Sequence, residues 1–169
     1  NINGEHTSYE DTVYTSDLLT EHAVEWMDQL ESDQPFFVYL SHKAVHSKFK
    51  QAARHAGMYA GVDYELPATY SQTQDESYKE LLWPEWVKQQ RHSWHGVDYM
   101  YHAKGAVGDL VIDYCETLMG VDESIGTVMA YLEARGIADE TVVIYMGDNG
   151  FSWGEHGLID KRHFYEESA

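Results

Sequence analysis

Thr141-Val142-Val143-Ile144-Tyr145-Met146-Gly147-Asp148-Asn149-Gly150 (residues 141–150) carries the clearest structural signal in the chain. Its first six residues are mostly β-branched or aromatic, which is typical of a strand buried on both faces in a parallel sheet. The last four residues form a turn sequence. Ligands of open α/β sheets bind beyond the carboxyl ends of the strands, so the polar residues of this turn are the first candidates for a site.

Helices and strands alternate along the chain. Apolar residues at spacings of three and four predict a helix over residues 17–30, with Ser16 as its N-cap. The apolar run 36–40 predicts a second buried strand. The same spacing recurs over residues 107–132 and predicts a long helix that Gly136 ends. The order helix, strand, helix, strand predicts an α/β fold with parallel strands.

The stretch between the first strand and the long helix has weak periodicity. We expect residues 47–104 to be a long, mostly irregular insertion with one helix around residues 76–82. Two strands do not complete a sheet, so we expect part of a mixed, mostly parallel sheet flanked by helices, incomplete in this chain. The chain begins at Asn1 without a Met, and we interpret residues 1–169 as part of one domain.

Composition excludes several classes of protein. The 169 residues are 43% hydrophobic, which is enough for a packed core. The formal charge of −18 argues against binding to nucleic acid or to an anionic membrane surface. No apolar run reaches the roughly 18 residues of a membrane span. Cys115 is the single cysteine, so an internal disulfide framework and a cysteine-cluster zinc site are excluded.

Asp148 and Asn149 are the first candidate ligands. A carboxylate and an amide oxygen suit Ca²⁺ or Mg²⁺, although Ca²⁺ takes roughly six to eight ligands. From the dipeptide alone, an ordinary turn is the favoured alternative. Lys161 and His46 are candidate cations for an anionic substrate. Taken singly, a solvated lysine and a locally hydrogen-bonded histidine are the simpler interpretations.

An aromatic-rich stretch holds further candidates, the histidines His92, His95 and His102 and the tryptophans Trp83, Trp86 and Trp94. The histidine spacing does not fit two zinc ligands on one helical turn, so a substrate-facing loop is favoured over a zinc site. The indole rings suit either stacking on sugars or filling of the core. Cys115 has no adjacent histidine base, which argues against a nucleophile, and we expect Glu123 to lie on a solvated face.

Three segments together resemble the type I sulfatases, which are formylglycine-dependent members of the alkaline phosphatase superfamily. The first is Pro35-Phe-Phe-Val-Tyr-Leu-Ser-His-Lys-Ala-Val-His46, and the second is Asp122-Glu-Ser-Ile-Gly126 on the long helix. The third runs from Thr141 to Ser168 and includes Gly154-Glu-His-Gly157, Asp160-Lys-Arg162 and Tyr165-Glu-Glu-Ser168. Residues 50–104 lie outside the resemblance and look specific to this member.

The resemblance implies hydrolysis of a sulfate ester with a formylglycine nucleophile and a Ca²⁺ ion. It implies that Asp148 and Asn149 are two of the metal ligands. Lys161 is implied to contact the sulfate, with His46 beside it assisting the leaving group and His156 lining the substrate side. It also implies a secreted, periplasmic or lysosomal-type compartment, and the tryptophans favour a sulfated carbohydrate as substrate.

The chain departs from the family pattern at the nucleophile. No Cys-or-Ser, X, Pro, X, Arg motif is present, and Cys115 is followed by Glu-Thr-Leu. The early Asp-Asp metal pair of the family is also missing. The resemblance is therefore to the middle portion of the catalytic domain, which is not expected to be catalytic without the remaining segments of that domain.

Two other functions stay open from the sequence. One is a phosphatase or phosphonate-ester hydrolase of the same superfamily, which uses similar carboxylate and histidine ligands. The other is a non-catalytic acidic module that holds glycans through Ca²⁺ or aromatic side chains.

Overall fold

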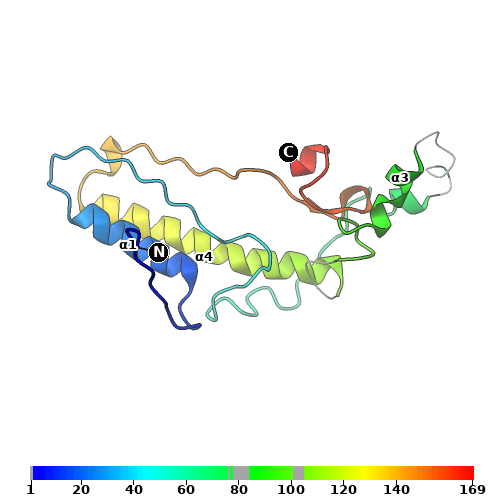
Figure 1. Cartoon of the computed structure of the whole chain (residues 1–169), viewed down its shortest axis with the longest axis horizontal. Coiled ribbons are helices and arrows are strands. Elements are labelled where there is room, and N and C mark those ends of the chain that lie inside the picture. Colours follow the sequence, from blue (N-terminus) through cyan, green and yellow to red (C-terminus); the bar gives the residue numbers. More distant parts are fainter. Residues whose placement is uncertain (1, 76, 78–83, 101–104) are drawn as a thin grey trace. The chain divides into compact units, whose positions relative to one another are not determined.

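The computed structural model describes residues 2–75, 77, 84–100 and 105–169 (Figure 1). It divides into two compact units, one of residues 1–58 and 116–142 and the other of residues 59–115 and 143–169. The helix expected around residues 76–82 lies, except for residue 77, outside the described residues. None of the helices described has the length and apolar character of a membrane span.

The described elements are three α-helices, two strands and short 3-10 turns. The α-helices are α1 (Thr15–Asp28), α3 (Glu85–Lys88) and α4 (Val107–Ala134). The strands are β1 (Ser152–Trp153) and β2 (Ile159–Asp160). The 3-10 turns are η1 (Gln72–Gln74), η2 (Gln89–His92), η3 (Ala138–Glu140), η4 (Glu155–Gly157) and η5 (Glu166–Ser168).

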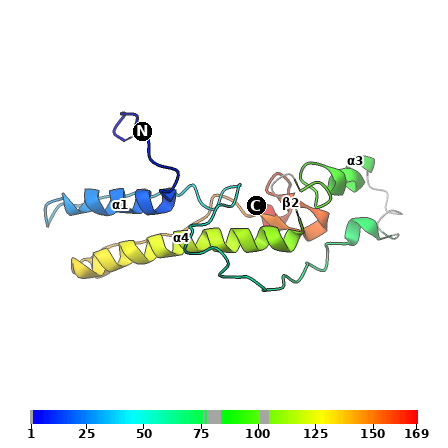
Figure 2. The ribbon, with the colours of Figure 1, turned by 90° about the horizontal axis from the view of Figure 1, so that it is seen from below.

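The first unit pairs α1 with the second half of α4 (Figure 2). The N-cap of α1 is Tyr14 rather than Ser16, so the predicted start was two residues late. Ser16 cannot cap because it lies inside the helix, where its side chain is buried and its carbonyl accepts a hydrogen bond from Thr20 Oγ1 at 2.7 Å. The buried positions of α1 are Ser16, Thr20 and Met27, a narrower and more polar face than the periodicity predicted.

Small side chains line the contact between α1 and α4. Thr20 Oγ1 and Ser124 Oγ share a buried hydrogen bond of 2.5 Å. One helical turn earlier in α4, a Cβ added to Gly120 would lie 2.6 Å from the ring of Tyr14. Such a distance is well inside normal van der Waals contact, so the absence of a side chain at this position allows the ring to pack against the helix.

Gly120→Ala is expected to destabilise the protein, although Gly→Ala in a helix interior normally stabilises by about 1 kcal/mol. Displacing the Tyr14 ring costs about 1–3 kcal/mol, which outweighs the gain in helix propensity. Gly126 is the matched control, because it is exposed on the same helix and no atom lies within 4 Å of an added Cβ. Gly126→Ala should therefore stabilise. Urea unfolding of both variants checks the opposite signs, and equal signs would contradict this packing.

The predicted end of the long helix is confirmed. Gly136 has a φ of +70°, a conformation that L side chains rarely adopt. Its N–H donates to Glu133 O at 2.9 Å, and the N–H of Ile137 donates to Leu132 O at 3.0 Å. These two bonds make a Schellman motif, which satisfies carbonyls that the helix end would otherwise leave unpaired.

The second unit holds a small antiparallel sheet. β1 pairs with β2 through the registers Ser152–Asp160 and Trp153–Ile159. On the other edge of β2, Gly96 forms an antiparallel bridge with Leu158, and Ile159 N donates to His95 O at 2.7 Å. The segment around Gly96 comes from the insertion, so the insertion extends the sheet on which the 154–161 region is built.

Neither of the strands predicted at 36–40 and 141–146 is formed within the described part of the chain. The side chains of Phe37 and Val142 are 85% and 87% exposed. A strand exists only through hydrogen bonds to a neighbouring strand, and no described segment pairs with either run. The expected mostly parallel sheet is thus replaced, in the residues described, by the antiparallel β1–β2 pair, and the helices with this pair make a partial α/β domain.

Candidate functional site

The turn after residue 146 presents two candidate oxygen ligands. Asp148 and Asn149 are exposed, and Asn149 Nδ2 donates to Gly150 O at 2.6 Å. Because this bond occupies the amide nitrogen, Asn149 Oδ1 remains as an acceptor. A Cβ on Gly150 would lie 2.2 Å from Glu167 O, so only glycine allows the turn to pack against the 165–169 segment.

These donors fit Ca²⁺ in kind. A carboxylate and an amide oxygen are hard ligands, and both face solvent at one turn. They supply only part of the roughly six to eight oxygens that Ca²⁺ takes, so further ligands must join them. Over the described ranges, no three His, Cys, Asp or Glu side chains gather into a metal-binding group.

The side chain of His156, in η4, contacts three other side chains. Its ring stacks on Tyr165 with centroids 3.9 Å apart and an interplanar angle of 16°. Its Nδ1 lies 3.0 Å from Gln72 Oε1, and its Nε2 lies 3.9 Å from a carboxylate oxygen of Glu167. Because Tyr165 and Glu167 belong to the segment that Gly150 contacts, the structure brings His156 and the Asn149–Gly150 turn against one stretch of chain.

Lys161 directly follows β2. Its N–H donates to Asp160 Oδ1 at 2.7 Å, and its side chain is half-buried. None of the ion pairs found between described residues involves the Lys161 ammonium; the nearby pairs are those of Asp160 with His95 and with Arg162. Such a lysine is available to an anionic ligand, and an ammonium can bind a sulfate or phosphate oxygen as a compact charge.

His46 belongs to the first unit, whereas Asp148, Asn149, His156 and Lys161 belong to the second. Its side chain is exposed, and its Nδ1 lies 2.7 Å from Ser47 O. A carbonyl only accepts, so Nδ1 carries a proton and Nε2 is the acceptor of the neutral ring. Locally, His46 is therefore a hydrogen-bonded loop histidine with one ring nitrogen committed.

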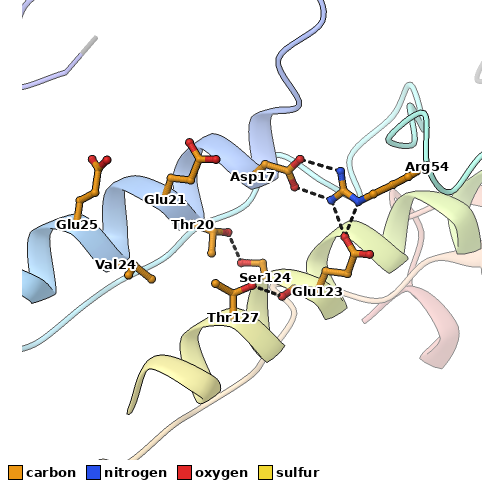
Figure 3. Close-up of a pocket in the computed structure, with 9 residues that line it drawn as sticks. All are labelled: Asp17, Thr20, Glu21, Val24, Glu25, Arg54, Glu123, Ser124 and Thr127. Atoms are coloured by element: carbon orange, nitrogen blue, oxygen red, sulfur yellow. Dashed lines mark hydrogen bonds and ion pairs between the residues drawn. The ribbon is translucent and has the colours of Figure 1, made fainter. Parts of the chain in front are cut away.

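The first unit contains a pocket of about 390 Å³ that is lined mostly by polar and charged residues of α1 and α4, with Arg54 (Figure 3). Arg54 donates to both carboxylate oxygens of Asp17 at 2.7 and 2.8 Å and to Glu123 at 2.7 Å. His55 Nε2 contacts the other oxygen of Glu123 at 2.9 Å. Arg54 and then His55 hold the pKa of Glu123 below its usual value. Glu123 is exposed, as expected of a solvated face, and it also anchors the start of the insertion through Arg54 and His55.

The insertion contributes contacts that sequence reasoning missed. Thr69 Oγ1 accepts the N–H of His156 at 3.2 Å, and His95 Nδ1 lies 2.7 Å from the buried Asp160 carboxylate. The one available signal was the aromatic, histidine-rich composition of this stretch, which predicted a substrate-facing loop. His92 instead contacts Asp98 at 2.8 Å. His102 lies outside the described residues.

Two of the three candidate tryptophans lie in the described residues, and both are exposed. Trp86 and Trp94 are 67% and 59% exposed, so the core-filling alternative is wrong for both, and Trp83 lies outside the described residues. Burial raises the pKa of the Cys115 thiol, which agrees with the expectation that Cys115 is no nucleophile.

We expect the melting temperature to fall as the pH is lowered from 7.5 to 5. Burial lowers the pKa of His163 from its ordinary value of 6.5, and burial lowers the pKa of His42 in the same direction. The unfolded chain binds these protons more readily, so the stability is fully present above about pH 6.5 and is lost as the pH falls through the lowered values. His163→Gln should reduce this fall in melting temperature, whereas His6→Gln, at an exposed histidine, should leave it unchanged. An unchanged dependence of the melting temperature on pH in the His163 variant would contradict the role of His163.

Comparisons with known proteins match nearly the whole chain. The family model described as Sulfatase matches residues 3–168. An N-acetylglucosamine-6-O-sulfatase of Bacteroides thetaiotaomicron is 27% identical over 91% of this chain and 36% of its own length. The multifunctional alkaline phosphatase superfamily protein PehA of Trinickia caryophylli is 26% identical over 90% of this chain and 30% of its own length. The chain therefore spans about a third of these relatives.

A solved structure shares the fold. That structure is described as a protein in complex with its substrate D-glucosamine-2-N,6-O-disulfate. It matches 98% of this chain and 43% of the solved chain, with a TM-score of 0.72 and 24% sequence identity. At this identity the match concerns the fold, and it agrees with a partial α/β domain.

Proposed function

Because the chain belongs to the sulfatase family, we propose that it supplies part of the active site of an enzyme that hydrolyses sulfate esters of a carbohydrate. One observation carries the proposal. The turn that carries the oxygen atoms of Asp148 and Asn149 contacts the 165–169 segment through Gly150, and the ring of His156 stacks on Tyr165 of the same segment. Lys161 lies four residues before this segment, and its ammonium forms no ion pair with a described carboxylate. A metal-binding turn near an available cation suits an anionic ester.

Asp148 and Asn149 would hold the Ca²⁺ ion. When bound, the ion supplies positive charge that stabilises the sulfuryl oxygens and favours the ionised nucleophile. The Asp148 carboxylate would provide the charged ligand, and the Asn149 amide would provide Oδ1, because its Nδ2 is bonded to Gly150 O.

Lys161 and His46 are proposed as the catalytic side chains. Lys161 would bind a sulfuryl oxygen and stabilise the charge that develops there in the transition state. His46 would protonate the leaving alkoxide oxygen from its imidazolium form, because Nδ1 is committed to Ser47 O and the neutral ring has no proton on Nε2. His156, stacked on Tyr165, would contact the substrate beside Lys161.

The nucleophile of the proposed enzyme comes from sequence outside residues 1–169. The chain contains no Cys-or-Ser, X, Pro, X, Arg motif, and the nucleophile that the resemblance implies is formylglycine. The other segments of the same catalytic domain are therefore partners of this chain. On the same family grounds we propose a secreted, periplasmic or lysosomal-type location.

A sulfated sugar is the proposed substrate. One relative is named as an N-acetylglucosamine-6-O-sulfatase, and Trp86 and Trp94 in the insertion expose flat rings that suit the C–H faces of sugars.

The second candidate is a phosphatase or phosphonate-ester hydrolase, which a relative named as a multifunctional member of the alkaline phosphatase superfamily favours. The test is turnover of 4-nitrophenyl sulfate, 4-nitrophenyl phosphate and N-acetylglucosamine-6-sulfate by the full-length protein with Ca²⁺. We expect kcat/KM for sulfate esters to exceed that for the phosphate at least tenfold. The reverse order would favour the phosphatase, and glycan binding without any turnover would favour a non-catalytic module.

A further inference from the structure

Asp160 is an unusual residue directly before Lys161. Its side chain is 1% exposed, and its φ is +103°, a conformation that L side chains rarely adopt. A buried carboxylate is costly unless it is hydrogen-bonded. A strained backbone persists only where its surroundings over-determine it, and such residues cluster at functional sites. Both features raise the question of what Asp160 holds in place.

The Asp160 carboxylate joins the lysine loop to the insertion. Its Oδ1 accepts the N–H of Lys161 at 2.7 Å, and its Oδ2 lies 2.7 Å from His95 Nδ1 and 3.2 Å from Arg162 Nε. His95 lies 65 positions earlier in the chain. One side chain thus contacts the segment that carries the candidate sulfate ligand and the segment that was expected to be a family-specific addition.

The backbone reinforces this connection. Ile159 N donates to His95 O at 2.7 Å, and Val97 N donates to Gly157 O at 3.0 Å. These bonds set the register of residues 157–159 against the insertion. The bond between the Asp160 side chain and His95 adds one more link to the insertion, directly before Lys161.

We propose that Asp160 is a positioning residue for Lys161, an inference that rests on the proposed function. The Asp160 carboxylate bonds both His95 and the Lys161 N–H, and it thereby sets the position from which the Lys161 ammonium contacts an oxygen of a sulfate monoester. The insertion thereby takes part in sulfate recognition, because it carries His95, the partner that orients the carboxylate.

Asp160→Asn in the full-length protein is the first test. Asparagine keeps the size and one acceptor for the Lys161 N–H, but it loses the charge and turns an N–H₂ group toward His95 or Arg162. We expect kcat/KM for 4-nitrophenyl sulfate to fall about 10–100-fold and the inhibition constant of inorganic sulfate to rise similarly. Asp98→Asn is the matched control, because Asp98 bonds Arg91 and His92 within the insertion, and it should stay within threefold.

A double-mutant comparison separates positioning from a merely structural role. In a Lys161→Ala background, Asp160→Asn should change kcat/KM less than threefold, because the residue through which it acts is gone. An equal loss of kcat/KM in both backgrounds would overturn the proposal. An Asp160→Asn variant whose kcat/KM stays within threefold of the wild-type value would also overturn it. Ca²⁺ affinity should be unchanged throughout.

His95→Ala keeps the proposal testable if Asp160→Asn does not fold. The His95 side chain is 31% exposed, so its removal is better tolerated than a change at the buried carboxylate. It should weaken inhibition by inorganic sulfate about 3–10-fold in the wild type and not in the Lys161→Ala background; an equal effect in both would contradict positioning. A wild-type protein that turns over no sulfate ester refutes the proposed function instead, and calorimetric titration with sulfate then still tests the inference.

Discussion

Asp148→Ala in the full-length protein is expected to abolish Ca²⁺ binding at this site and to lower kcat/KM for sulfate esters by about 10³-fold or more. The variant removes the proposed charged ligand of the turn and leaves only the neutral Asn149 oxygen there. Metal stabilisation of the transition state is worth several kcal/mol, and each 1.4 kcal/mol is about tenfold in rate.

The readouts for Asp148→Ala are calorimetric titration with Ca²⁺ and the rise in melting temperature that Ca²⁺ produces, since an ion that binds the folded state alone stabilises it. Asp63→Ala is the control, because Asp63 is an exposed acid of the same unit that belongs to none of the candidate motifs. Unchanged Ca²⁺ binding and activity in the Asp148 variant would refute the metal assignment and leave an ordinary turn.

Lys161→Ala has the second largest expected effect. It should lower kcat/KM for sulfate esters by about 10²–10³-fold, the loss typical of removing one group that stabilises charge in a transition state. The fold should persist, because the half-buried side chain forms no ion pair with a described carboxylate and the N–H that bonds Asp160 remains.

Lys161→Arg sharpens this prediction. Arginine keeps the positive charge but presents a planar fork in place of a compact ammonium, so we expect it to recover part of the rate. Lys50→Ala, an exposed lysine of the first unit, is the control and should remain active. Full activity of Lys161→Ala at an unchanged melting temperature would remove Lys161 from the proposed mechanism.

The helices could be predicted from the sequence, and the strands could not be placed. The periodicity of α4 and its stop at Gly136 depend on residues within one or two turns, so the pattern was sufficient. The N-cap of α1 was misplaced because Ser16 has the right chemistry for a cap, whereas in the structure it lies buried inside the helix and its carbonyl accepts a hydrogen bond from Thr20. Residues 36–40 and 141–146 have the amino-acid composition of strands, but a strand forms only when another segment pairs with it, and composition does not identify that segment.

The candidate site shows the same division. Asp148, Asn149, His156 and Lys161 were chosen from short motifs that lie close together in the chain, and the structure adds the surroundings of each. Their roles stay predictions that the variants above test. Asp160 went unnoticed because an aspartate before a lysine has no signature of its own, and only its burial and its bond to His95 distinguish it.

The sequence alone determined the short-range features: two amphipathic helices, a glycine that ends one of them, and a turn with candidate oxygen ligands. Each of these features depends on interactions between residues a few positions apart. The folded structure alone decided that the Asp160 carboxylate bonds His95, that Arg54 joins Asp17 to Glu123, and that Gly120 accommodates the ring of Tyr14. These pairs are 37 to 106 positions apart, and no short-range rule links them. Such contacts follow from the path of the whole backbone, because burial and hydrogen bonding act on residues that folding brings together.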